Sequence, residues 1–243
     1  MTYCLAISTN KGLVFASDSR TNAGVDYVTT YSKMRRYVWP DERLCVLLSS
    51  GSLATTQAVL NRVERDLETD SKENLRSGQY LFEVASYIGR LSQKEQQVHE
   101  TALEKSKSNG EASFILGGQI AGQPPEIFLI YPQGNCISAS PETPYLQIGE
   151  NKYGKPILDR IITPSTSLED AARCALVSLD STIRSNISVG PPVELLIHTR
   201  DEIDEPYHAR LTLNSPMYKS LQKRWNEGLR RAFRRLPRFE WEE

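Results

Sequence analysis

The pattern of apolar and polar positions predicts strands that come in groups rather than strands that alternate with single helices. Two apolar stretches, residues 4–8 and 13–16, are separated by a Thr-Asn-Lys-Gly turn, which is typical of a β-hairpin. Further short strands are predicted, in chain order, at residues 27–31, 36–39, 44–48, 112–117, 127–131, 136–139, 145–148, 193–199 and 207–213. The sheets that they form are therefore expected to be antiparallel.

Apolar residues recur at helical spacing in five other segments. The predicted helices cover about residues 52–67, 79–103, 152–160, 167–184 and 216–235. The polar stretch 93–109 is either the solvated end of the second helix or a loop. Groups of strands separated by pairs of helices favour an α+β domain, with helices on the outer faces of antiparallel sheets.

No change of composition marks a linker, so residues 1–243 are predicted to form a single domain. Residues 216–243 are predicted to be a basic C-terminal helix and tail. Apolar residues recur there at steps of four, beginning at Met217 and ending at Phe233. This stripe either docks on the body of the domain or contacts a neighbouring subunit.

Composition and charge exclude several classes of protein. The formal net charge is −1, which gives no general attraction to nucleic acid or to a membrane surface. No apolar run approaches the ~20 residues of a membrane span, and the first residues lack the pattern of a secretory signal. We therefore expect a cytoplasmic protein with no nucleic-acid or membrane partner.

The cysteines and histidines give no support for a metal site. The four cysteines form no CxxC pair, and the three histidines share no local spacing typical of metal ligands. We therefore expect buried, reduced thiols and no metal or other cofactor.

Thr2 is the first candidate for chemistry. Removal of Met1 would leave a hydroxyl and a free α-amine on the same residue. An α-amine has a pKa of about 8, so part of it is neutral at physiological pH and can accept the hydroxyl proton. Nucleophile and general base would then belong to one residue. A second-position threonine is common, however, and carries little weight alone.

Three further residues make Thr2 a stronger candidate. Asp18 ends the second predicted strand, and Lys33 follows after a loop rich in Thr, Asn and Gly. A lysine beside the threonine would lower the pKa of its hydroxyl and amine, and an aspartate would keep the lysine charged and oriented. Gly51 lies between an apolar strand and a helix, where its N–H could stabilise an oxyanion. Taken separately, the two charged residues would be ordinary surface groups and the glycine a simple turn.

These residues resemble the core pattern of proteasome β-type subunits. The motifs that carry the resemblance are Thr2, GLVFASDSR (12–20), Lys33 and Ser49-Ser50-Gly51-Ser52. Three segments resemble in particular the bacterial ancestral beta subunit (Anbu) branch: DSRTNAGVD (18–26), YLQIGENKYGKP (145–156) and DSTIRSNISVGPP (180–192). The resemblance covers roughly residues 2 to 213.

The resemblance implies a fold and a mechanism. The fold would be the four-layer αββα sandwich of N-terminal-nucleophile hydrolases, working without a cofactor as a ring-like or open-ring homo-oligomer. The implied nucleophile is Thr2, the aspartate is Asp18, the lysine is Lys33 and the oxyanion glycine is Gly51. The implied activity is that of a threonine peptidase.

The chain also departs from the proteasome pattern. Lys33 is one residue closer to the nucleophile than in most proteasome subunits, and Gly149 is followed by Glu150 where proteasomes have a serine. The further aspartate and serine of the family have three candidates here: Asp180, Asn186 and Ser188. Two alternatives therefore stay open: an amidase for a dedicated small or conjugate substrate, and a catalytically silent scaffold subunit.

Overall fold

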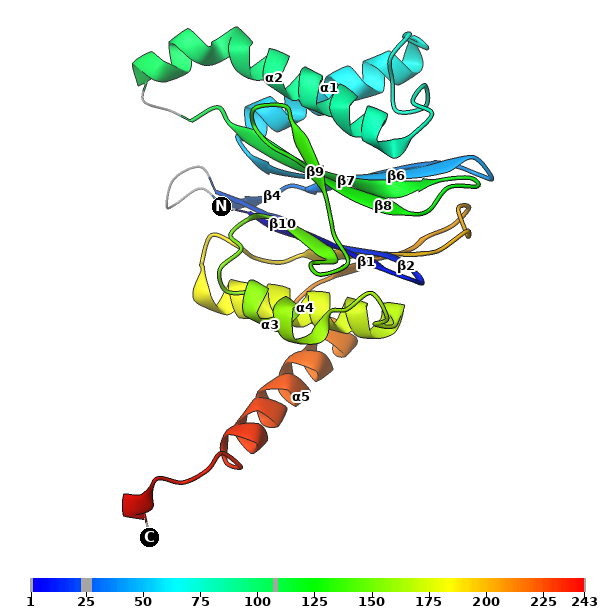
Figure 1. Cartoon of the computed structure of the whole chain (residues 1–243). Coiled ribbons are helices and arrows are strands. Elements are labelled where there is room, and N and C mark those ends of the chain that lie inside the picture. Colours follow the sequence, from blue (N-terminus) through cyan, green and yellow to red (C-terminus); the bar gives the residue numbers. More distant parts are fainter. Residues whose placement is uncertain (1, 23–27, 107–108, 243) are drawn as a thin grey trace.

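Two five-stranded sheets lie face to face, and helices cover their outer faces (Figure 1). The computed structural model describes residues 2–22, 28–106 and 109–242. The first sheet has the order β10-β1-β2-β11-β12, formed by Tyr145–Gly149, Tyr3–Thr9, Gly12–Asp18, Val193–Thr199 and Tyr207–Leu211. The second has the order β5-β6-β7-β8-β9, formed by Met34–Trp39, Arg43–Gly51, Ala112–Ile120, Glu126–Ile130 and Cys136–Ser138. All neighbouring strands pair antiparallel, so the predicted four-layer α+β sandwich is confirmed.

The helices form the two outer layers. α1 (Leu53–Glu68) and α2 (Leu81–Ser106) cover the second sheet, and α3 (Lys155–Ile161) and α4 (Leu168–Ser185) cover the first (Figure 1). The Ser52 hydroxyl caps α1 by accepting a hydrogen bond from Thr55 N at 3.4 Å. Of the two interpretations of residues 93–109, the helical one holds as far as Ser106. No helix in the described residues is long and apolar enough to cross a membrane.

The space between the sheets is filled by apolar side chains from both inner faces. Residues that alternate along β2 and β6, such as Leu13, Phe15, Val46 and Leu48, are fully buried there. Residues on the opposite faces of the same strands pack against α4 or against α1 and α2. This packing fixes the start of β1 against the end of β6, which is where the candidate residues meet.

A small ribbon leaves the end of β2, and the apolar pattern predicts only the second of its two strands. β3 (Arg20–Asn22) and β4 (Val28–Thr30) pair with each other and form a separate two-stranded sheet. Part of the strand predicted at 27–31 is β4, and Tyr27 lies outside the described residues. Tyr31 N donates to the Ser19 carbonyl at 2.8 Å, which closes the ribbon and returns the chain to the end of β2.

The cysteines are unpaired, and three of the four are buried as expected. Cys4, Cys45 and Cys174 lie in the core. Cys136 is only half-buried, because β9 is the edge strand of the second sheet.

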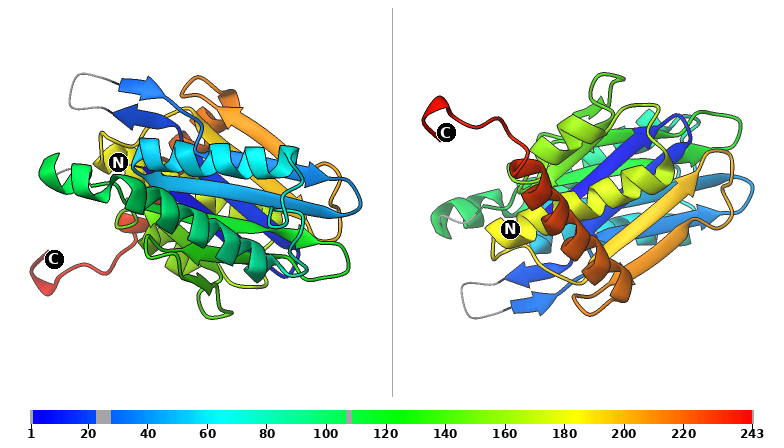
Figure 2. Two further views of the ribbon diagram at one scale, coloured as in Figure 1. Left: turned by 90° about the horizontal axis from the view of Figure 1, so that it is seen from above. Right: turned by 90° about the horizontal axis from the view of Figure 1, so that it is seen from below.

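α5 (Pro216–Phe233) begins on the body of the domain and then projects away from it (Figure 1). Seen from below, it lies in front of the layer that α3 and α4 form (Figure 2, right). Tyr218 is fully buried among residues of β1, β11 and α4, and Leu221 packs beside it. Farther along, Leu229 is 49% exposed and Phe233 74% exposed. The apolar stripe therefore docks on the body only around Leu221, with Trp225 half-buried and Met217 at its start exposed.

A buried histidine bridges the two sheets. His198 Nε2, on β11, lies 2.8 Å from Gln119 Oε1, on β7, and Asp201 N donates to the same oxygen at 2.9 Å. The amide oxygen can only accept, so Nε2 carries the proton. Burial lowers the pKa of His198 below its usual value, so the folded protein holds this imidazole neutral.

This histidine predicts acid sensitivity of the fold. In the unfolded chain a histidine takes up a proton near pH 6.5, whereas folded His198 does so only at lower pH. Its contribution is therefore present above pH 6.5 and is lost as the pH falls, by up to about 1.4 kcal/mol per pH unit. Unfolding in urea between pH 5 and pH 8 should show a shallower acid-side decline for His198→Gln than for the unsubstituted protein. Equal slopes would contradict the prediction.

Candidate functional site

Thr2 lies immediately before β1, and it is nearly buried, with 9% of its surface exposed. The peptide group that joins Thr2 to Tyr3 is held by neighbouring segments through both its N–H and its carbonyl. Tyr3 N donates to Asp18 Oδ1 at 3.0 Å, and the Thr2 carbonyl accepts a hydrogen bond from Glu150 N at 2.7 Å. The position of Thr2 is therefore set by the ends of β2 and β10, which flank β1.

The end of β10 requires a glycine. Gly149 has a φ of +84°, which side chains rarely tolerate, and a Cβ there would lie 2.0 Å from the Thr2 carbonyl oxygen. In the sequence, Gly149 is notable only because Glu150 follows it where proteasome subunits have a serine. Its structural role is to let β10 approach Thr2 closely.

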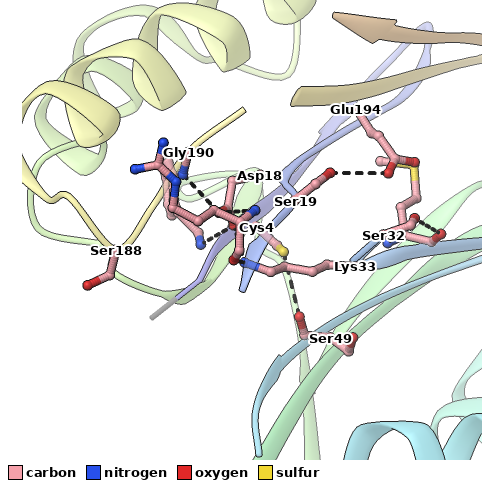
Figure 3. A network of polar contacts seen from close by, with 12 residues as sticks. Cys4, Asp18, Ser19, Ser32, Lys33, Ser49, Ser188, Gly190 and Glu194 are labelled. Atoms are coloured by element: carbon pink, nitrogen blue, oxygen red, sulfur yellow. Dashed lines mark hydrogen bonds and ion pairs between the residues drawn. The ribbon is translucent and has the colours of Figure 1, made fainter. Parts of the chain in front are cut away.

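Lys33 and Asp18 form a buried ion pair. Lys33 Nζ donates to Asp18 Oδ1 at 2.6 Å and to the Arg20 carbonyl at 2.7 Å. Figure 3 shows Lys33 pointing toward Asp18, with Gly190 on the opposite side of the carboxylate. Asp18 Oδ2 accepts from Arg20 N at 3.2 Å and from Gly190 N at 3.1 Å. The side chains are 6% exposed for Lys33 and fully buried for Asp18.

Burial and charge act in opposite directions on Asp18. Burial raises the pKa of its carboxyl, whereas the Lys33 ammonium and the N–H groups of Tyr3 and Gly190 act to lower it. The charge of this carboxylate therefore depends on Lys33 rather than on solvent. Burial also raises the pKa of the nearby Cys4 thiol, so Cys4 stays protonated and is a poor candidate for a nucleophile.

Gly51 ends β6 with a φ of +104°. A Cβ at this position would lie 2.2 Å from the Glu111 carbonyl oxygen, so the close approach of β7 explains why a glycine is needed. From the sequence, this glycine is expected either to stabilise an oxyanion with its N–H or to form a simple turn, and neither role would by itself require the close approach seen here. Its backbone still lines the same cavity as Thr2.

One cavity of about 650 Å³ brings the candidate residues together. Thr2, Lys33 and Gly51 all line it, and Asp18 lies behind Lys33. A hydroxyl, an ammonium group and backbone donors therefore face one space, which suits nucleophilic attack on a carbonyl. Across the described residues, no three His, Cys, Asp or Glu side chains are grouped so that they could hold a metal ion.

Asp180 is not among the residues that line this cavity. It lies on α4, where Oδ2 accepts from Arg184 Nε at 2.9 Å and Oδ1 accepts from Gln222 Nε2 at 2.5 Å. Because Gln222 belongs to α5, Asp180 anchors the C-terminal helix to the body.

Asn186 and Ser188 follow α4 and lie closer to Thr2. Asn186 Nδ2 donates to Glu150 Oε2 at 3.0 Å, and Asn186 Oδ1 accepts from Ser188 N at 2.9 Å. Asn186 is thus linked to the residue whose N–H holds the Thr2 carbonyl. Ser188 lies on the same segment as Gly190, and its hydroxyl points away from the ion pair (Figure 3).

Several residues of the site were not identified as such from the sequence. Arg20 lines the cavity, and its Nη1 donates to the Ile187 carbonyl at 2.6 Å. Gly190 supports Asp18, and Ser113 reaches the cavity from β7. Arg20 belongs to the Asp-Ser-Arg motif and was within reach of sequence reasoning. Ser113 was not, because nothing near it in the chain distinguishes it from an ordinary strand residue.

Comparison with known proteins identifies relatives of the whole chain. The family model described as "Proteasome subunit" matches residues 2–197. An Anbu (Gly-1) mutant from Hyphomicrobium sp. strain MC1 is 40% identical, with a TM-score of 0.91, over 99% of this chain and 100% of that chain. Anbu (ancestral beta-subunit) from Yersinia bercovieri is 40% identical, with a TM-score of 0.93, over 98% of this chain and 99% of that chain.

A third solved structure, the helical assembly of the Anbu complex from Pseudomonas aeruginosa, is 43% identical, with a TM-score of 0.93, over 98% of each chain. Among curated proteins, none matches. A family model that spans most of the chain and full-length structural relatives agree with the site geometry: the chain belongs to the proteasome subunit family, and within it to the Anbu proteins.

Proposed function

We propose that this protein is a threonine-type amide hydrolase, most simply a peptidase, whose nucleophile is Thr2 once Met1 has been removed. The observation that carries the proposal is the cavity shared by Thr2, Lys33 and Gly51, with Lys33 held in place by buried Asp18. Membership of the proteasome subunit family supports the same chemistry.

In the first step the Thr2 α-amine takes the proton of the Thr2 hydroxyl while Oγ attacks the carbonyl carbon of the substrate. The Lys33 ammonium lowers the cost of the developing alkoxide. The carbonyl oxygen becomes an oxyanion, and the N–H of Gly51 donates to it. The C–N bond then breaks, and the protonated α-amine gives its proton to the leaving nitrogen.

In the second step water hydrolyses the acyl ester. The α-amine, neutral again, takes a proton from the water as its oxygen attacks the ester carbon. The bond to Oγ breaks, Oγ recovers a proton and the acid leaves. Every proton is handled by Thr2 itself, so the mechanism needs no cofactor.

Two alternatives make different use of the same residues. An amidase for a dedicated small or conjugate substrate would keep the chemistry and differ only in what fills the cavity. A silent scaffold subunit would not need a lysine buried beside the nucleophile. Holding an ammonium group away from water is costly, so the Lys33–Asp18 pair favours an active site.

The first prediction concerns the nucleophile. Protein whose intact mass shows the loss of Met1 should be labelled by a peptide epoxyketone, because this electrophile reacts with a hydroxyl and an α-amine on one residue. Thr2→Ala should abolish the labelling, and Thr9→Ala, at the far end of β1, should not. Undiminished labelling of Thr2→Ala would place the nucleophile elsewhere, and a fully retained Met1 would rule out the mechanism in that preparation.

The second prediction concerns the ion pair. Lys33→Ala should lower turnover by about 100-fold or more, because the hydroxyl loses the cation that favours its deprotonation. The matched control is Lys155→Ala, which removes a lysine of the exposed Lys155–Asp159 pair and should leave turnover unchanged.

Loss of Lys33 alone leaves the Asp18 charge buried and unpaired, which destabilises the fold. The double variant Asp18→Asn Lys33→Met removes both charges, so it should fold and still be inactive. Turnover at the unsubstituted rate in either folded variant would show that Lys33 has no part in catalysis.

We further propose that the protein works as a ring-like or open-ring homo-oligomer. The relative from Pseudomonas aeruginosa is described as a helical assembly. The second half of α5 has exposed apolar residues, including Leu229 and Phe233, that the chain itself does not cover. Contact with a second subunit would bury them.

The third prediction tests this role of α5. Removing residues 229–243 keeps buried Tyr218 and the Gln222–Asp180 bond, so the body should fold while the particle becomes smaller in light scattering. The pair Leu229→Ser Phe233→Ser should have the same effect. The control pair Glu227→Ser Arg231→Ser changes exposed positions of the same helix, outside the hollow that Leu229 and Phe233 line, and should not. An unchanged particle size in the truncated protein would contradict a role for this segment in assembly.

A further inference from the structure

Hydroxyl groups make up a large part of the lining of the cavity beside Thr2. Of the described residues that line the cavity, eight carry a hydroxyl, and only Leu53 and Pro132 have aliphatic side chains. Its volume of about 650 Å³ is large enough for a substrate side chain together with part of the adjoining backbone. The chemistry of the lining therefore selects among substrates.

Five of these hydroxyls have no hydrogen-bond partner within the described part of the chain, those of Thr2, Thr21, Ser49, Ser50 and Ser113. Apart from the proposed nucleophile Thr2 and from Thr21 on β3, they belong to Ser49 and Ser50, at the end of β6, and to Ser113, on β7. Ser50 and Ser113 are directly opposite each other in the β6–β7 register, so they share one face of the sheet, whereas Ser49 lies on the other face. Ser50 is only 7% exposed. By contrast, the Thr56 hydroxyl donates to the Leu53 carbonyl at 3.0 Å, and the Ser52 hydroxyl caps α1.

Hydroxyls that have no protein partner and face a cavity favour a ligand that can replace the hydrogen bonds made by water. An aliphatic side chain would displace water from Ser50 and Ser113 and leave their hydroxyls without hydrogen bonds, which is costly. A side chain that both donates and accepts would satisfy them. Sites built in this way discriminate strongly against isosteric groups that lack the polar atoms.

The charges around the cavity do not favour a charged substrate side chain. Arg20 Nη1 is bonded to the Ile187 carbonyl, and Lys33 is paired with Asp18. Glu111 provides a carboxylate on the wall, and its Oε2 accepts from Asn109 Nδ2 at 3.2 Å. Cationic and anionic groups thus both line the cavity, and each already has a partner.

We infer that the cavity binds a neutral hydrogen-bonding side chain, such as that of asparagine, glutamine, serine or threonine, next to the amide bond that Thr2 attacks. Ser50 and Ser113, which share one face of the β6–β7 pair, determine this specificity. The inference rests on the proposed function, and it adds the class of substrate.

The experiment uses four peptide epoxyketones that differ only in the residue beside the electrophile: asparagine, leucine, aspartate or lysine. Asparagine and leucine are close in size and shape, so their comparison isolates hydrogen bonding. The rate of labelling is followed by intact mass on protein that begins at Thr2. The asparagine compound should react at least about tenfold faster than the leucine compound, and faster than either charged compound.

Substitution of Ser50 and Ser113 tests whether these serines cause the preference for asparagine. Ser50→Ala Ser113→Ala should reduce the ratio of the asparagine rate to the leucine rate severalfold, mainly by slowing the asparagine compound. Ser138→Ala is the matched control, because Ser138 is exposed on β9 and does not line the cavity. Thermal unfolding of each variant verifies that it is folded.

The outcomes separate the two proposals. No labelling by any of the four compounds would count against Thr2 as the nucleophile. Labelling in which leucine reacts as fast as asparagine would overturn the specificity and leave the nucleophile standing. A preference for lysine would overturn it too and would point to Glu111. An asparagine preference that survives in Ser50→Ala Ser113→Ala would overturn the role of these serines.

Discussion

The buried ion pair between Lys33 and Asp18 connects segments that are far apart in the sequence. Through Asp18, the end of β2 is bonded to the start of β1 at Tyr3 N and to the approach to β11 at Gly190 N. Through Lys33, whose carbonyl accepts from Ser49 N at 3.0 Å, the same pair is connected to β6 in the other sheet. Two charges that would be costly to bury alone are thus stabilised by each other and by backbone donors. The cavity beside Thr2 depends on all of these segments keeping their positions.

The layers of this fold were predictable because they depend on local patterns. The hairpin at residues 4–16 follows from two apolar stretches and a turn, and the helix after Gly51 follows from a cap and an apolar stripe. Of the β3–β4 ribbon only β4 was predicted, because β3 consists of Arg20, Thr21 and Asn22 and has no apolar residue that a pattern could reveal. α5 shows that a regular apolar pattern does not establish that the whole helix packs against its own domain. Its stripe is regular over its whole length, yet only the part near Tyr218 finds a surface on this chain.

The residues of the site can likewise be divided into those that a local sequence pattern identifies and those that it does not. Asp18 and Lys33 follow predicted strands and belong to a motif, so their proximity could be anticipated before the ion pair was seen. Asp180 was a reasonable candidate by residue type, but α4 directs it toward Gln222 on α5 instead of the cavity. Ser113 became visible only through the β6–β7 register, which places it opposite Ser50. Motifs therefore identify the groups that react, whereas the groups that surround a substrate come from strand pairing and have no local signature.

The choice of threonine at position 2 fits this dependence on strand pairing. A β-branched side chain has few χ1 rotamers, so the direction of its hydroxyl follows closely from the backbone. The peptide group between Thr2 and Tyr3 is held by two hydrogen bonds. On one side Tyr3 N donates to Asp18, and on the other Glu150 N donates to the Thr2 carbonyl. The close approach of β10 is possible only because Gly149 has no side chain. A change at any of these backbone contacts would move the hydroxyl relative to Lys33 and the serines, even though none of the contacts involves a reacting atom.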